Sequence, residues 1–451
     1  MTASPKTFDQ FVDDSFIKLV RTIPETATSL GIDDHPDLEI CRRKFADYSP
    51  EGTDARVATI AEAHRDLLQH AQQDLSTSDA LTAEVYRYFL EYPCFDGLVG
   101  VHGKRFAFHD FHVNPQAGVQ TEFINRLVYG CAIRDAADAA IYLERLAQLP
   151  AAILAAIEGL RFRQSRGIVL PEFLLSEVID EQRQFLDCPV EENQLLSSFV
   201  AKCQAPRLSG DLAAACAKIL ATEVYPAYAE LLAALEGQQD SAPGEGGAWQ
   251  LPDGDAYYAY RLRRETTTEL AADEIHDVGI AESAKLRNEL TRELAHLGYD
   301  DPSFAAQFSA MAADERFRYP QNELGREMML ADFAACLDTI KPQVRDAFVE
   351  FPKAELVIEP TARHLEKTRT TTYTPAARDG SRPAIFELNV GMSLASPSWE
   401  VPTLAYHEGI PGHHFQISIA QEQQRLGHPP PIRTGMAPGY AGFQGNCSLR
   451  K

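Results

Sequence analysis

Three histidines and a glutamate fall within eight residues near the end of the sequence, in the segment His407-Glu408-Gly409-Ile410-Pro411-Gly412-His413-His414. Histidine is the commonest metal-binding side chain, and a glutamate directly after the first histidine is where zinc hydrolases carry their general base. The usual spacing H-E-x-x-H is absent, because Pro411 stands four residues after His407. A zinc site therefore requires a departure from regular helix geometry at this point.

Helix geometry indicates what this departure must be. Zinc–nitrogen bonds are about 2.0–2.1 Å long, so two ligating imidazoles must converge on one point. In a straight helix His414 lies roughly 10.5 Å along the axis from His407, and His413 points about 120° away from it. Pro411 has no N–H for the carbonyl of His407, and Gly412 relaxes the backbone, so a two-residue bulge can form there.

The bulge predicts a role for each side chain of the motif. Without Pro411 and Gly412 the segment reads His-Glu-Gly-Ile-His, which restores the zinc-hydrolase spacing. We therefore predict His407 and His413 as zinc ligands, Glu408 as the general base, and His414 as a neighbour that does not bind the metal. The alternative is a histidine-rich helix end at the protein surface that binds no metal.

The composition argues against several classes of partner. Lys and Arg total 42 against 65 Asp and Glu, which gives a net charge of -23 at pH 7. This charge argues against binding to nucleic acid and to anionic membrane surfaces. We find no apolar run of about 18 residues, so we expect no segment that spans a membrane.

The cysteines and the first residues indicate a compartment. All 8 cysteines are scattered singly, without a C-x-x-C pair, which is typical of reduced thiols and not of a disulfide framework. Residues 1–6 lead into acidic sequence without the apolar core of a signal peptide. We therefore expect a cytoplasmic protein.

Helical periodicity dominates the elements that must position the motif. Apolar residues recur at helical spacing along most of the sequence, which predicts a mainly α fold. Pro150 is expected to break the periodic stretch 135–164 into two helices. A loop rich in Gly and Gln at 236–256 is expected to separate an N-terminal helical part, 1–235, from a catalytic part, 257–451. The two parts could also form one intimately packed domain.

A small β-sheet is predicted beside the metal motif. Between residues 357 and 390, β-branched and aromatic residues alternate with polar ones, and 384–390 reads as a strand. In zinc peptidases of this type a strand next to the metal helix pairs with the substrate backbone. The strand 384–390 is a candidate for that role, and an ordinary strand within the sheet is an equal alternative.

Four further side chains could contact a substrate or support the ligands. Tyr373 could donate a hydrogen bond to the oxyanion of a tetrahedral intermediate. Arg382 and Arg433 could each form a bidentate pair with the C-terminal carboxylate of a peptide, although surface salt bridges are the simpler explanation for both. Asn389 lies near the end of the predicted strand and is the fourth of these candidates.

The sequence resembles the bacterial family known as domain of unknown function 885, whose fold is similar to the helical carboxypeptidases of the Taq type. The resemblance extends over essentially the whole chain. Besides the metal motif, it is carried by the segments Pro-Glu-Thr-Ala-Thr-Ser-Leu-Gly at 24–31, Pro-Asp-Gly-Asp-Ala-Tyr-Tyr at 252–258, Arg-Glu-Thr-Thr-Thr at 264–268, Glu-Ile-His-Asp-Val-Gly at 274–279, and Tyr-Thr-Pro at 373–375 with Asp-Gly-Ser-Arg-Pro at 379–383. The resemblance implies a large helical fold of the gluzincin type with a deep channel, and a zinc-dependent peptidase activity.

The resemblance also implies a third zinc ligand. Members of the family are expected to continue into Glu-Gly-Trp-Ala-Leu-Tyr-x-Glu, whose first glutamate binds the metal. Here Gln444-Gly445 stands at that position, followed by six residues. Dropping one base from the codons for Gly445 and Asn446 would recover most of the family's block, so we expect an out-of-frame ending and a truncated chain that binds zinc weakly or not at all and is inactive. A short homologue with a disordered tail is the alternative.

These observations support two hypotheses of different classes. The first is a zinc metallopeptidase that hydrolyses a peptide or a small amide. Glu408 would take a proton from the attacking water and pass it to the leaving amine. The second is a catalytically incompetent remnant or a non-enzymatic helical protein that binds peptides. No Gly-rich phosphate loop and no serine nucleophile elbow supports a third class of site.

Overall fold

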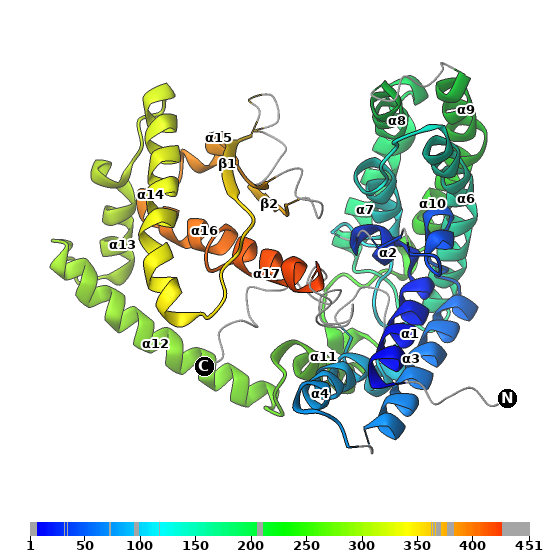
Figure 1. Ribbon diagram of the computed structural model, residues 1–451, viewed down its shortest axis with the longest axis horizontal. Helices are drawn as coiled ribbons and strands as arrows, with labels where there is room; N and C mark the ends of the chain where they lie inside the picture. The colour runs from blue at the N-terminus through cyan, green and yellow to red at the C-terminus, as the bar shows by residue number, and fades with distance from the viewer. Residues whose placement is uncertain are drawn as a thin grey trace. The chain divides into compact units, whose positions relative to one another are not determined.

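The computed structural model describes residues 7–425, apart from 31, 34, 72–73, 94–98, 117, 205–210, 362, 364–365, 367–370 and 377–382. The chain divides into two compact units, Met1–Glu269 and Leu270–Lys451. Figure 1 shows the helices and strands of both. The predicted mainly α fold with a small sheet is confirmed.

The first unit is built from helices. Its α-helices are α1 (Phe8–Thr22), α2 (Pro24–Leu30), α3 (Pro50–His70), α4 (Thr77–Glu91), α5 (Val119–Asn125), α6 (Ala136–Gln164), α7 (Glu172–Asp187), α8 (Gln194–Gln204), α9 (Asp211–Ile219), α10 (Tyr225–Glu236) and α11 (Gly254–Thr266). Short 3-10 or π turns join several of them: η1 (Glu39–Arg43), η2 (Val101–Phe106), η3 (Arg126–Gly130), η4 (Val190–Glu192), η5 (Leu220–Val224), η6 (Gln239–Ser241) and η7 (Ala248–Gln250).

Helix α6 is the long central helix of this unit and packs against α10. The side chain of Asp135 caps its N-terminus by accepting from the N–H of Asp138. The predicted break at Pro150 is wrong, because α6 runs through it without interruption. Leu149 and Ile153 are both fully buried on either side of the proline, so burial of the two halves in one core outweighs the hydrogen bond that proline removes.

Helix α6 is also long and apolar enough to cross a membrane by length and composition. This is weak evidence by itself, because core helices pass the same test. The buried face of α6, which includes Tyr142, Leu146 and Ile157, is occupied by the core of the first unit. Packing within the protein therefore accounts for the apolar residues of that face.

Helix α11 begins at Gly254, within the stretch 236–256 that the sequence predicted as a separating loop, and it belongs to the first unit. The hydroxyl of Tyr257 donates to Oδ1 of Asp110 at 2.6 Å, and Nη1 of Arg261 donates to the same oxygen at 2.8 Å. These bonds hold α11 to the segment after η2. The compact units consequently divide after Glu269, on the C-terminal side of that loop.

The second unit combines helices with a three-stranded sheet. Its elements are α12 (Ala272–His296), α13 (Phe304–Ala313), η8 (Glu315–Phe317), α14 (Glu323–Ala347), β1 (Leu356–Pro360), β2 (Thr372–Thr374), β3 (Ala384–Leu388), α15 (Val390–Ser393), η10 (Ser398–Glu400), α16 (Val401–Glu408) and α17 (His413–Arg425). Within the described residues the strand order is β1-β3-β2, with β1 parallel and β2 antiparallel to β3.

One hydrophobic core joins the sheet to the helix that carries the first metal-motif residues. Phe386 and Leu388 of β3 pack in a cluster with Met329 and Phe333 of α14 and with Ala405 of α16. All five are buried. The rings of Phe333 and Phe386 meet edge to face, with centroids 5.5 Å apart. This core fixes the position of α16, and therefore of His407 and Glu408 at its end.

Truncating the centre of this core should destabilise the second unit. Phe386 is 0% exposed, and we expect Phe386→Ala to lower the free energy of unfolding by about 3–5 kcal/mol, through lost burial and an internal cavity. The matched control is Leu324→Ala at an exposed position of α14, which should change stability by less than about 0.5 kcal/mol. Urea unfolding of both variants measures the difference, and equal effects would contradict the assignment of the core.

Candidate metal centre

The metal motif spans the end of one helix and the beginning of the next. Helix α16 ends at Glu408, residues 409–412 form bends, and α17 begins at His413. The helical conformation is therefore interrupted over four residues. The sequence predicted a shorter departure, a two-residue bulge inside one helix. The N–H of Gln416 donates to the carbonyl of Gly412 at 3.1 Å, and the N–H of Phe415 donates across the break to that of Gly409 at 3.3 Å.

Two glycines permit the close approach of backbone that this interruption requires. A Cβ on Gly412 would overlap the carbonyl oxygens of His407 and Tyr406. A Cβ on Gly409 would meet the side chain of Leu337 in α14. The backbone at 412 therefore lies directly against the last turn of α16. This contact returns the chain to α16 and brings the beginning of α17 close to His407.

The interruption brings together the three side chains that the sequence singled out. Ligand atoms of His407, Glu408 and His413 all lie within 4.8 Å of one another. The two imidazole rings have centroids 4.6 Å apart and planes inclined at 81°. His407 is exposed, His413 is half-buried and Glu408 is buried. The cluster therefore has one side open to solvent and one side in the protein interior.

The carboxyl group of Glu408 lies in a poorly solvated position. Its side chain is 8% exposed, and burial raises the pKa of this carboxyl to about 7. Burial disfavours the charged carboxylate because water that would solvate it is excluded. A carboxyl with a pKa near neutrality can both accept and return a proton at physiological pH.

The electrostatics of His413 favour its neutral form. Burial lowers the pKa of this imidazole, and the neighbouring His407 lowers it further. A protonated imidazole cannot bind a metal, because ligation requires the free lone pair on nitrogen. The position of His413 is therefore suited to a metal ligand.

His414 is not part of the three-residue cluster. It is 2% exposed, and burial lowers its pKa to about 4. Its Nδ1 lies 3.3 Å from the hydroxyl of Tyr373 and 3.3 Å from that of Ser418. Tyr373 comes from β2, so the pair of His414 and Tyr373 connects the edge of the sheet to α17. The ring of Tyr373 also stacks near that of His413, with centroids 6.3 Å apart.

The remaining candidates have different surroundings. Asn389 is fully buried and caps α15, since its Oδ1 accepts from the N–H of Met392 at 2.9 Å while its Nδ2 donates to the carbonyl of Glu366 at 2.8 Å. These bonds give its side chain a role in holding the backbone. Arg382, Arg433 and Gln444 lie outside the described residues.

The prediction that 384–390 pairs with a substrate backbone is wrong. β3 is the central strand: it pairs with β1 through Leu356↔Ala384 to Pro360↔Leu388, and with β2 through Thr372↔Glu387 to Thr374↔Ile385. Both of its edges are occupied by neighbouring strands, so the alternative of an ordinary sheet strand holds. The alternation of residue types in the sequence identified the strand but could not reveal its neighbours.

Two residues that hold α17 were not singled out from the sequence. Oε1 of Glu422 accepts from the N–H groups of Lys353 and Ala354, at 2.6 and 3.1 Å, which ties α17 to the segment before β1. Ser418, at 1% exposure, contacts His414 one turn earlier in the helix. Its spacing of four residues from His414 is a signal that the sequence did contain.

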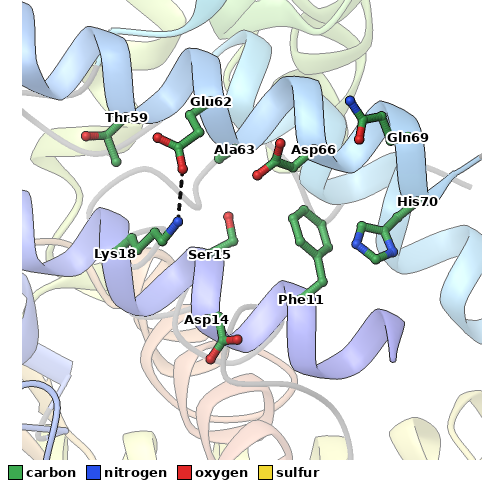
Figure 2. A pocket seen from close by; sticks show the side chains of 10 residues that line it. All are labelled: Phe11, Asp14, Ser15, Lys18, Thr59, Glu62, Ala63, Asp66, Gln69 and His70. Atoms are coloured by element: carbon green, nitrogen blue, oxygen red, sulfur yellow. Dashed lines mark hydrogen bonds and ion pairs between the residues drawn. The ribbon is translucent and has the colours of Figure 1, made fainter. Parts of the chain in front are cut away.

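A groove of about 200 Å³ lies in the first unit between α1 and α3. Figure 2 shows Lys18 paired with Glu62 and His70 beside Phe11 on its two walls. The Lys18–Glu62 distance is 2.9 Å between exposed side chains, and the rings of Phe11 and His70 stack with centroids 4.4 Å apart. These groups interact with one another at the surface, so the groove offers no built binding site.

The family model of the bacterial protein of unknown function DUF885 matches residues 24–439. The chain belongs to this family. Among solved structures it is similar to "the putative lipoprotein from Colwellia psychrerythraea", with a TM-score of 0.80 and 22% identity over 96% of this chain and 75% of that one. It is also similar to "a putative lipoprotein of unknown function from Shewanella oneidensis", with a TM-score of 0.66 and 13% identity over 96% of this chain and 74% of that one. The curated proteins contain no match.

These comparisons bear on fold and location. At these identities the two solved structures show that the fold is shared. Each is described as a "putative lipoprotein", and this description contradicts the prediction of a cytoplasmic location. That prediction relied on singly spaced cysteines and on the first six residues, and neither feature reports directly on where a protein is delivered.

Alanine substitutions at two glycines test the close backbone contact at Gly412. We expect Gly412→Ala to destabilise the second unit by at least about 2 kcal/mol, because the added Cβ overlaps backbone oxygen that cannot move aside. At Gly279, in the exposed part of α12, an added methyl group would meet no atom within 4 Å, so Gly279→Ala should stabilise the helix by about 0.5–1 kcal/mol. Chemical denaturation of both variants measures the two effects, and a neutral Gly412→Ala would contradict the close approach.

Proposed function

We propose that this protein is a zinc-dependent metallopeptidase whose metal is held by His407 and His413 and whose general base is Glu408. The observation that carries the proposal is the convergence of these three side chains, from two helices, to within 4.8 Å. The gluzincin-like fold with a substrate channel, and the similarity to Taq-type carboxypeptidases, are parts of the same proposal.

The donor set suits zinc. Two imidazole nitrogens and a nearby carboxylate are the ligand types found at catalytic zinc sites. Burial and the neighbouring His407 keep His413 in the neutral form that ligation needs, and the exposure of His407 leaves the site accessible. A bound zinc ion would supply Lewis acidity, polarising the scissile carbonyl and acidifying water.

Glu408 supplies the proton transfer. Its carboxylate adjoins both histidines, and its pKa of about 7 matches a group that must be deprotonated in one step and protonated in the next. In the proposed reaction Glu408 accepts a proton from the attacking water. It later donates that proton to the nitrogen of the leaving amine, which allows the peptide bond to break.

Tyr373 and its strand are the proposed means of positioning the substrate. β2 is an edge strand of the sheet in the described residues, next to the central strand β3. An edge strand can bind an extended peptide through main-chain hydrogen bonds, independently of the side chains that the peptide carries. Tyr373 lies on β2 with its ring 6.3 Å from that of His413, so its hydroxyl is a candidate donor to the oxyanion.

The proposed substrate is a peptide or a small amide. The metal and Glu408 would act on the amide bond itself, so these residues do not specify the side chains that flank it. A catalytic zinc site normally has three protein ligands, of which the described residues offer two histidines in addition to Glu408. The third ligand is proposed near Gln444, where this sequence has an amide in place of the family's glutamate and so does not supply it. The substitutions that follow are therefore to be measured in a chain whose reading frame after Gly445 is restored. Zinc binding without hydrolysis of any peptide would favour the non-enzymatic peptide-binding alternative.

The ligand assignment predicts which histidine substitutions remove the metal. His407→Ala and His413→Ala should each lower zinc affinity by at least about a hundredfold, since each removes a direct ligand. His414→Ala is the matched control, because His414 is adjacent in sequence but points toward Tyr373 and Ser418. Competition with a chromogenic chelator measures the affinities. Retention of zinc by His413→Ala together with its loss in His414→Ala would reverse the assignment.

The assignment of the base predicts a separation of binding from turnover. Glu408→Gln keeps the size of the side chain but cannot accept a proton. We expect it to retain zinc and to lose at least about a hundredfold in kcat on a peptide library. Near-normal turnover would remove Glu408 from the mechanism, and loss of zinc would make Glu408 a ligand.

A further inference from the structure

The first unit contains a buried arginine whose donors are only partly used. Arg145 on α6 is 0% exposed. Its Nη1 donates to the hydroxyl of Thr28 at 3.0 Å and to Sγ of Cys131 at 3.6 Å, and the guanidinium lies 5.0 Å from the ring centroid of Phe45. Nε and Nη2 have no hydrogen-bond partner within the described part of the chain. A buried cation left in this state is costly, which indicates that an anion belongs beside it.

A second cation interacts electrostatically with Cys131. This cation is Lys202 on α8, and burial lowers the pKa of its ammonium group. Its Nζ donates to the carbonyl of Leu127 at 2.9 Å and lies 5.7 Å from the ring centroid of Tyr142. Cys131 therefore lies under the influence of Arg145 and Lys202 at once, on a segment between η3 and α6.

Two other acidic groups, Glu25 and Cys41, also interact electrostatically with Arg145. Burial raises the pKa of the Glu25 carboxyl, which disfavours its charged form. Burial likewise raises the pKa of the Cys41 thiol to about 11, so that thiol stays neutral. A thiolate on Cys131 would accept a charge-assisted bond from Nη1 of Arg145 directly. Cys131 is also partly exposed to solvent, whereas Cys41 is buried.

We propose that Cys131 is a reactive thiol that is oxidised by hydroperoxides. Thiolates beside Lys and Arg are the forms of cysteine that react with peroxide. The thiolate attacks one oxygen of hydrogen peroxide, a sulfur–oxygen bond forms and the oxygen–oxygen bond breaks. The released hydroxide takes a proton and leaves as water. Sulfur loses two electrons to the peroxide, and Nε and Nη2 of Arg145 are the donors left for the new oxygen on Cys131.

Cys188 provides an internal comparison. It is also partly exposed, but its thiol donates to the carbonyl of Pro189 at 3.6 Å instead of accepting from a cation. Exposing the full chain to dilute hydrogen peroxide in the presence of dimedone, with quantitation of the modified peptides by mass spectrometry, measures sulfenic acid at both positions. We expect Cys131 to react at least about tenfold faster than Cys188. Equal rates, or a faster Cys188, would overturn the proposal.

Variants of Lys202 test the cause of the reactivity without altering the buried arginine. Lys202→Gln should slow the oxidation of Cys131 severalfold and leave Cys188 unchanged, while Lys202→Arg should restore the rate because it restores the charge. Lys218→Gln, at an exposed position of α9, is the control for a lost surface charge and should change neither rate. An unchanged Cys131 rate in a folded Lys202→Gln protein would also overturn the proposal.

Discussion

The arrangement of the candidate centre depends on one close contact, the packing of the backbone at Gly412 against the carbonyl of His407. Only a residue without a Cβ fits there. Because the chain turns back at this point, His413 begins a new helix beside the last turn of α16 and its ring meets that of His407 at 4.6 Å. A continuous helix would separate the same two rings along its axis and around its circumference. The interruption of the helix is therefore the feature that brings the two histidines together.

The two helices that meet at this contact are each anchored in the hydrophobic interior of the second unit. α16 is held by Ala405 and Val401 in the cluster that contains Phe386 and Phe333. α17 is held separately, through Phe415 in a smaller cluster with Val344 and Ile410. Each helix end is thus fixed by its own apolar anchor, and both anchors include residues of α14. Rigid supports on either side of a short break are what a ligand pair drawn from two helices requires.

Features set by local residue preferences were predicted from the sequence, and features set by tertiary contacts were not. The pair of His407 and His413 followed from local rules, since Pro411 and Gly412 carry their backbone preferences wherever they occur. The strand at 384–388 followed from alternation of residue types. The neighbours of β3 did not, because pairing joins residues such as Leu356 and Ala384 that are distant in sequence. The prediction of a helix break at Pro150 was wrong for a related reason. Burial of α6 in the tertiary structure outweighed the local tendency of proline to break a helix.

X-ray crystallography of the zinc-soaked protein, with anomalous data collected at the zinc absorption edge, would locate the metal directly. We expect an anomalous peak about 2.0–2.2 Å from a ring nitrogen of His407 and of His413, with the Glu408 carboxylate nearby but not bonded to the metal. A zinc ion bound to His414 and not to His413, or no zinc among these residues, would contradict this assignment.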